Sequence, residues 1–90
     1  MTKSEMIDQM AADLNMPKAQ VRRMVDSFVD SVVASLKNGK KVQLSGLGVF
    51  DVRKRAARTG RNPQTGEAIN IPARNAVGFR AAKSLRDAVN

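Results

Sequence analysis

The sequence predicts an α+β fold, in which helices form the N-terminal part and antiparallel strands follow and extend into a long two-stranded arm. Apolar residues recur at helical spacing up to residue 36 and alternate at strand spacing from residue 41 onward. Residues 53–67 hold five Lys or Arg residues before their first carboxylate and almost no large apolar side chain. This stretch cannot bury itself in a core, although sequence typical of strands flanks it on both sides.

The N-terminal part contains the signals of two helices. Thr2-Lys-Ser-Glu5 fits a capping box, and the apolar residues after it share one helical face until Asn15-Met16-Pro17 interrupts the pattern. Pro17 is suited to open a second helix, because the first turn does not need its missing N–H. That helix is expected from about Lys18 to Asn38, with Gly39 placed to end it.

The second helix has an apolar stripe wider than one neighbouring helix can cover. A symmetric dimer would bury the excess, so the stripe predicts one. The alternative is that the sheet of the same chain covers the excess. The residues expected at the dimer interface come from this helix and from the sheet, and they are Val25, Phe28, Val29, Val32, Leu36, Leu44, Leu47, Phe50 and Phe79.

The strands of the body lie on either side of the arm. Lys41–Ser45 alternates like a short strand, Gly46-Leu-Gly48 forms a tight turn, and Val49–Arg55 begins the next strand. No Gly-Lys-Ser/Thr helix follows the turn, which argues against a nucleotide site, but the N–H groups of Gly46 and Gly48 could contact the phosphate of a polyanionic partner. After the arm, Pro72 requires an edge strand or a bulge. Val77 and Phe79 are expected to rejoin the core, and a short helix from about 81 to 88 ends the chain, with Leu85 and Val89 facing inward.

The sequence of the arm predicts a β-hairpin whose tip lies at Asn62-Pro63 and Thr65-Gly66. An extended ribbon from residue 52 to residue 62 spans roughly 35 Å, which is enough to follow a groove around a DNA duplex. Guanidinium groups neutralise phosphates and enter the narrow minor groove, where the potential is most negative. We therefore expect the arm to bind double-stranded DNA through Arg53, Lys54, Arg55, Arg58 and Arg61.

Pro63 stands at the expected tip and is rigid, apolar and unable to donate a hydrogen bond. Such a residue is suited to act as a wedge between base pairs, which unstacks them and kinks the duplex. Asn62, Gln64 and Thr65 are expected to contact DNA beside it. Because minor-groove readout is degenerate, these side chains distinguish little beyond A·T from G·C pairs. Bent, nicked or flexible DNA should be preferred.

Charge and composition exclude several classes of function. Residues 1–38 carry equal numbers of basic and acidic side chains, so the net charge of +8 belongs to residues 39–90 and indicates a polyanionic partner. The absence of His and Cys, and of a close carboxylate pair, predicts no catalytic constellation, no metal site and no cofactor. No apolar run approaches a membrane span and the first residues are unlike a signal peptide, so a cytoplasmic location is expected. Binding to an acidic protein or membrane surface is the alternative from another class, and liposomes would test it.

Several motifs together resemble the bacterial HU and integration host factor family over all ninety residues. They are Val42-Gln-Leu44, Gly46-Leu-Gly-Val-Phe50, Arg58-Thr-Gly-Arg-Asn-Pro-Gln-Thr-Gly-Glu67, Ile71-Pro-Ala73 and Lys83-Ser-Leu-Arg-Asp-Ala88. The chain departs from the family pattern at three places: Leu47 stands where an aromatic residue is common, Ala81-Ala82 replaces Pro-Gly, and Pro17 replaces a serine cap.

The resemblance implies an intertwined dimer with a helical base, a three-stranded antiparallel sheet and two β-ribbon arms that wrap the DNA minor groove. Residues 1–39 would form the helical dimerisation part, 40–52 and 72–80 the sheet, 53–71 the arm and 81–90 the C-terminal helix. The implied function is that of a histone-like protein of the nucleoid that bends or compacts DNA. An HU-type homodimer is favoured, and the alternative is an integration-host-factor-type subunit that binds defined sites, with a heterodimer as one form. The family's phosphate contacts on the body would fall on Lys3, Arg74, Arg80 and Lys83, with Arg86 as a further candidate.

Overall fold

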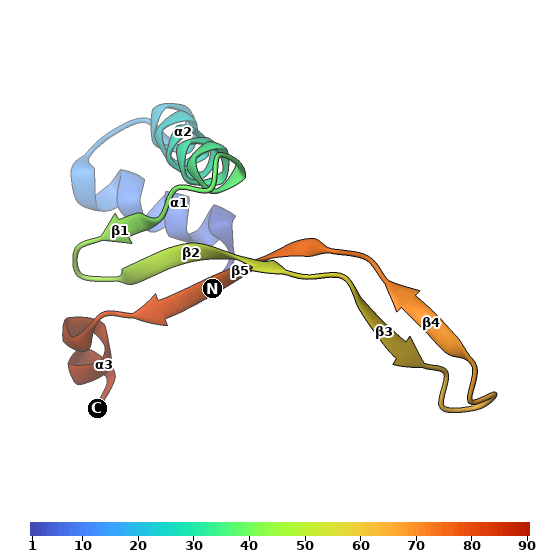
Figure 1. The fold of residues 1–90 in the computed structure, drawn as a ribbon. Helices are drawn as coiled ribbons and strands as arrows, with labels where there is room; N and C mark the ends of the chain where they lie inside the picture. The colour runs from blue at the N-terminus through green and yellow to red at the C-terminus, as the bar shows by residue number, and fades with distance from the viewer. The chain divides into compact units, whose positions relative to one another are not determined.

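The computed structural model describes residues 1–90 and contains three helices and five strands (Figure 1). The strands form a three-stranded antiparallel sheet of order β1-β2-β5 and a separate two-stranded sheet of β3 and β4, which confirms the α+β class. The chain divides into two compact units, residues 1–34 and 35–90. The elements are α1 (Lys3–Leu14), α2 (Lys18–Lys37), β1 (Val42–Leu44), β2 (Gly48–Arg55), β3 (Arg58–Arg61), β4 (Ala68–Ile71), β5 (Arg74–Ala81) and α3 (Lys83–Val89).

The two N-terminal helices begin and end where the sequence predicts. The Thr2 hydroxyl accepts a hydrogen bond from the Glu5 N–H at 3.2 Å, so the expected cap of α1 is confirmed. Asn15 ends α1 in the left-handed region with φ 51°, a conformation that asparagine tolerates better than most residues. Pro17 directly precedes α2, and its carbonyl accepts the N–H of Val21 at 3.2 Å.

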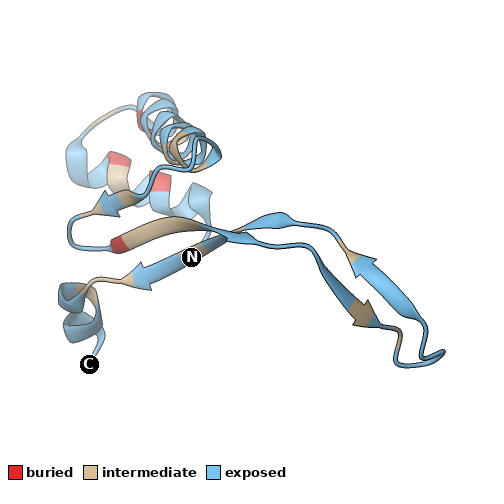
Figure 2. Cartoon of the chain, viewed as in Figure 1, coloured by how far each residue is buried: buried red, intermediate tan, exposed pale blue.

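The core of the first unit is small. Ile7, Ala11 and Val21 are buried, and the partly buried side chains of Met10, Met16 and Val25 pack against them. Figure 2 shows the buried positions as short red segments on α1 and α2, while most of α2 is drawn as exposed. Phe28 is 49 % exposed and Val29 and Val33 are each 44 % exposed. The apolar stripe of α2 is therefore left largely open in the single chain.

The three-stranded sheet has one apolar face. Phe50 pairs with Phe79, and Val52 pairs with Val77, across the antiparallel ladder of β2 and β5. Alternation of side chains puts these four residues on the same face, together with Val42, which pairs with Phe50 from β1. The rings of Phe50 and Phe79 lie with their centroids 4.8 Å apart. This face supplies the packing of the second unit.

The apolar face is only half covered. Phe79 is 51 % exposed and Val77 is 66 % exposed, so the expectation that they rejoin a core is not met within the single chain. Val89, at the end of α3, is 77 % exposed, and the prediction that it faces inward is wrong for the single chain. Leu85 on the same helix is half-buried. Alternating apolar residues show that a surface is to be buried, but they do not show whether the same chain or a second one covers it.

Gly48 is buried at the start of β2, where a side chain does not fit. A Cβ at this position would overlap the carbonyl oxygen of Arg80 and lie 2.8 Å from the ring of Phe79. We expect Gly48→Ala to lower the free energy of unfolding by about 2 kcal/mol or more, because backbone must move to admit the methyl group. Chemical denaturation measures this.

The matched control for this prediction is Gly46→Ala in the same turn. Gly46 has φ 88°, but a Cβ there meets no atom within 4 Å, so only the backbone strain applies. That strain costs on the order of 1 kcal/mol. An equal loss of stability in the two variants would contradict the packing role of Gly48.

Candidate nucleic-acid interface

The basic stretch predicted from the sequence is exposed along almost its whole length. Residues 53–59, 61 and 63–70 are exposed, and Gly60, Asn62 and Ile71 are half-buried. Within the second unit, Figures 1 and 2 show this stretch as a ribbon that continues away from the β1–β2–β5 sheet and ends in a free turn. The expectation that residues 53–67 do not fold inward is confirmed. We use the term arm for residues 53–71.

The two-stranded ribbon that carries the arm consists of two ladders with an interruption between them. The β2–β5 ladder runs as far as Arg55 opposite Arg74, and pairing resumes with Arg58 opposite Ile71. Two residues on each strand are unpaired between these points, and Pro72 is one of them. Proline has no N–H to donate, which explains why the ladder stops there. The sequence predicts an edge or bulge position for Pro72, and the structure places it in this interruption.

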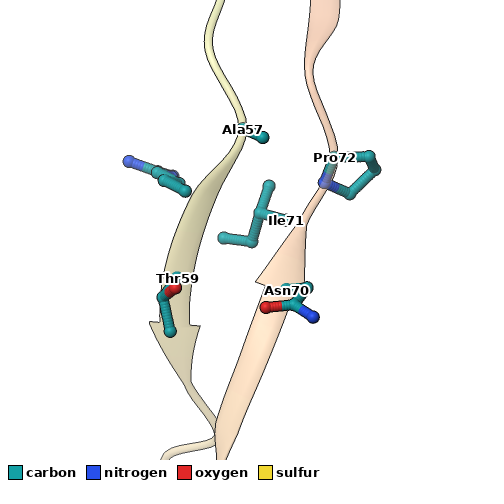
Figure 3. A pocket seen from close by; sticks show the side chains of 6 residues that line it. Ala57, Thr59, Asn70, Ile71 and Pro72 are labelled. Atoms are coloured by element: carbon teal, nitrogen blue, oxygen red, sulfur yellow. The ribbon is translucent and has the colours of Figure 1, made fainter.

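Two hollows lie beside the interruption. One, of about 350 Å³, is lined by four cationic side chains together with Ala56, Ile71 and Pro72; the cations are Lys54, Arg55, Arg58 and Arg74. The other, of about 260 Å³, is shown in Figure 3, where the side chain of Ile71 lies between the two strands and Thr59 and Asn70 stand on either side below it. The interruption is thus a part of the arm where positive charge is concentrated.

Strand register sorts the cations by face. Arg53 and Arg55 on β2 share a face with their neighbours Arg74 and Arg80 on β5, since residues 49, 51, 53 and 55 pair with 80, 78, 76 and 74. We call this set of four residues the arginine face. It is opposite the apolar face of the same sheet. Lys54 alternates to the other side.

Beyond the interruption the cations occupy both sides of the ribbon. Arg58 shares a face with Gly60, Ile69 and Ile71, whereas Arg61 lies on the opposite face of the β3–β4 ladder. A ribbon lying in a groove has phosphates on both sides of it. Cations on both faces suit that position better than a stripe on one face does.

The tip is held by hydrogen bonds within the turn. The Asn62 N–H donates to the Glu67 carbonyl at 2.8 Å, and the Gly66 N–H donates to the Asn62 carbonyl at 2.7 Å. The Asn62 side chain accepts the Gln64 N–H at 2.9 Å, as an Asx-turn does. Gly66 has φ 73°, a left-handed conformation that glycine adopts without steric cost, which explains why a glycine occupies this position. Asn62 therefore shapes the tip as well as being a candidate for contact with DNA.

Pro63 projects from this turn and is exposed. Thr65 accepts the Glu67 N–H at 3.3 Å, and Arg61 donates to the Gly66 carbonyl at 3.3 Å, so both stabilise the turn that presents Pro63. Gln64 is exposed and its side chain makes no hydrogen bond. The tip thus presents a rigid apolar residue that packs on no core.

Most of the candidate cations have no carboxylate partner. Among the residues named for the arm and the arginine face, only Arg53 forms an ion pair, with Asp51 at 3.8 Å. Lys3 pairs with Asp26 across the two helices of the first unit, so it must exchange that partner to contact a phosphate. Both groups of that pair are half-exposed, so the exchange costs little.

The remaining candidates lie at the ends of elements. Lys83 is exposed in the first turn of α3, and Gly46 is exposed in the turn between β1 and β2. Gly48 is buried and pairs with strands on both sides, so in this turn a phosphate contact is expected of Gly46 instead. No set of three or more His, Cys, Asp or Glu side chains is placed to hold a metal ion. No helix combines the length and the apolar character needed to cross a membrane.

The comparisons with known proteins agree over the full length. The family model described as bacterial DNA-binding protein matches residues 1–90. HU-beta proteins of Pseudomonas aeruginosa and Escherichia coli are 53 % and 52 % identical, each with both chains covered completely. The chain belongs to the bacterial HU family. HU 1 of Bacillus subtilis is 48 % identical, over 99 % of this chain and 97 % of the relative.

Solved HU structures share the fold of this HU-family chain. An Anabaena HU from a cocrystal with DNA has a TM-score of 0.87 at 36 % identity, covering 99 % of this chain and 97 % of the other. HU from Thermotoga maritima has a TM-score of 0.70 at 23 % identity with both chains covered completely, which supports the fold alone. The fold implied by the sequence motifs is therefore confirmed for the single chain.

Two features of this HU-family chain do not follow from its sequence. The arginine face depends on which residues of β2 and β5 stand opposite each other, and they are about 25 residues apart in the sequence. The interruption of the arm depends on Pro72 together with the two alanines at 56 and 57, which are compatible with an ordinary strand. The proline is a usable signal for a break in pairing, whereas nothing in the sequence sets the register.

Proposed function

We propose that this HU-family chain acts as a homodimer that binds double-stranded DNA with little sequence preference and bends or compacts it. The observation that carries the proposal is the exposed arm, which holds five cations within nine residues and has no core beneath it. Its HU-beta relatives are named DNA-binding proteins, and the Anabaena HU was crystallised together with DNA. No catalytic role is part of the proposal.

The dimer follows from the open apolar surfaces. Only three hydrophobic residues are buried in the single chain, while the stripe of α2 and the face of the sheet remain half exposed. At about 25 cal/mol per Å² of apolar surface removed from water, covering both surfaces is strongly favourable. A second copy offers the same two surfaces, as a symmetric interface requires. Of the residues predicted at the interface, Phe28, Val29, Leu47 and Phe79 are exposed in the single chain, and the other five are half-buried.

The arms are proposed to lie in the minor groove with Pro63 as the wedge. The exposed position of Pro63 on a hydrogen-bonded turn supports this role, because the ring packs on no core and is accessible to a duplex. Insertion between base pairs costs a few kcal/mol of unstacking, which the additional phosphate contacts of a bent duplex offset. Asn62, Gln64 and Thr65 would then contact the groove edges next to the kink.

Phosphates flanking the arms are proposed to contact the body of the protein. The candidates are exposed cations away from the arm tip, namely Lys3, Arg74, Arg80 and Lys83, with the backbone of Gly46 as a further contact. These contacts set the position of the protein on the duplex without reading its sequence. A protein with this activity would be located in the nucleoid.

The proposal predicts a particular order of affinities. At one salt concentration we expect linear duplexes of random and defined sequence to bind within about threefold of each other, and nicked or four-way junction DNA to bind more tightly, because less bending is needed. Anionic liposomes should bind far more weakly. Gel-shift titrations with a dimer of known mass measure the DNA affinities, and sedimentation with vesicles measures the binding to liposomes.

Two outcomes would contradict this reading. Liposomes that bind as tightly as duplex DNA would favour a basic module for acidic surfaces. A strong preference for one defined sequence would favour an integration-host-type subunit instead of an HU-type homodimer.

A further inference from the structure

Asp51 is the only carboxylate in the ladder of β2 and β5, and it lies on the arginine face. Its Oδ1 atom is buried and has no hydrogen-bond partner. The cationic group paired with it is the Nε of Arg53, two residues along the same strand, at 3.8 Å from Oδ1. A buried carboxylate oxygen without a hydrogen-bond donor lowers the stability of the fold, so the presence of an acid at this position needs an explanation.

The strand opposite Asp51 leaves room for this carboxylate. Gly78 is its partner across the ladder, and a Cβ at Gly78 would lie 2.6 Å from Oδ1 of Asp51 and 3.7 Å from Nε of Arg53. The missing side chain at Gly78 is therefore what lets the carboxylate lie against the strand beside the stem of Arg53. The carboxyl side chain is 27 % exposed, whereas that of Arg53 is 65 % exposed.

The contact uses one edge of the guanidinium. A guanidinium has five N–H donors, of which Nε carries one and the two terminal nitrogens carry four. The carboxylate faces Nε, at a distance that a shift of less than about 1 Å would convert into a charge-assisted hydrogen bond. The two terminal nitrogens then remain available for a bidentate contact with a phosphate.

We propose that Asp51 is a positioning residue, which holds the Nε edge of Arg53 so that its terminal nitrogens face a DNA phosphate at the root of the arm. The inference rests on the proposed DNA binding. It assigns a favourable role in that binding to a carboxylate whose negative charge alone would oppose it. A carboxylate that acted only by its charge would repel phosphates, and its removal would strengthen binding. The removal of a positioning residue would instead weaken binding.

A double-mutant cycle separates the two possibilities. We expect Asp51→Ala to weaken binding to a random duplex by about fivefold, the order expected of a partly exposed charge-assisted contact. In an Arg53→Ala background the same change should have no further weakening effect. Asp51→Asn keeps an oxygen that accepts from Nε, so it should recover most of the affinity. Glu67→Gln is the matched control, because Glu67 forms no ion pair and its neutralisation should strengthen binding slightly.

The outcomes are distinct. The inference would be overturned if Asp51→Ala bound DNA as tightly as the wild type or more tightly. It would also be overturned if Asp51→Ala caused an equal loss of affinity in the Arg53→Ala background. In both cases the binding of DNA by the wild type would still uphold the proposed function. A wild-type protein that does not bind duplex DNA would overturn both. Thermal unfolding and dimer mass are recorded for each variant, and if Asp51→Ala does not fold, the cycle is run with Asp51→Leu, for which the same weakening and the same dependence on Arg53 are expected.

Discussion

Replacing Arg53, Arg55, Arg58 and Arg61 with glutamine is expected to weaken the binding of random duplex DNA by at least about a hundredfold at moderate salt. Glutamine keeps polar character and much of the length of the side chain but removes the charge that displaces counterions from phosphates. All four arginines are exposed, and three of them have no carboxylate partner to release. Their substitution should therefore leave the fold intact. Gel shift or fluorescence anisotropy measures the loss, and circular dichroism checks the fold.

The control must remove the same net charge elsewhere. Lys18, Arg22, Arg23 and Lys37 are exposed on α2, and their replacement by glutamine lowers the net charge equally. We expect this control to weaken binding by no more than about tenfold, because these residues are not expected to contact DNA directly. If the two quadruple variants bind equally weakly, affinity follows net charge and the arm has no special role.

Pro63→Ala is expected to reduce the bend of the bound duplex much more than it reduces affinity. The proline contributes a rigid apolar ring at an exposed turn, and alanine is too small and too flexible to hold base pairs apart. The phosphate contacts remain, so affinity should fall by a factor of about three or less. Energy transfer between dyes at the two ends of a short duplex measures the bend.

Gln64→Ala provides the control for this measurement. Gln64 is the next residue in the same tip, and its backbone N–H, which holds the turn through Asn62, is retained in the variant. The variant loses the proposed contact of the Gln64 side chain with the groove edge, but that contact does not unstack base pairs. The bend should then stay close to that of the wild type. A bend left intact by Pro63→Ala would exclude the wedge role of the proline, whatever happened to affinity.

Features set by local sequence are predicted correctly. The Thr2 cap, the break at Pro17 and the end of α2 near Gly39 each depend on residues close to one another, and the structure has them within one or two positions. The exposed arm is predictable for a related reason. A stretch without large apolar side chains has nothing to bury, so its composition alone excludes a place in the core.

Features set by distant pairing are not predictable from the sequence. The arginine face requires the register of β2 against β5, and Asp51 gains its position only because Gly78 stands opposite it. The sequence likewise overestimates the interior, since periodicity assigns Phe79 and Val89 to the core and both are exposed in the single chain. Periodicity identifies an apolar surface whose exposure to water is unfavourable, but the surface that covers it can belong to a second copy of the chain.

The salt dependence of duplex binding tests the central claim most directly. Four arginines in each of two arms give about eight phosphate contacts for a dimer, which corresponds to a slope of about −7 for log affinity against log salt concentration. The quadruple arm variant should have a slope several units shallower. A wild-type slope close to zero would contradict the account, because an exposed basic arm that binds DNA through phosphates must release counterions when it does so.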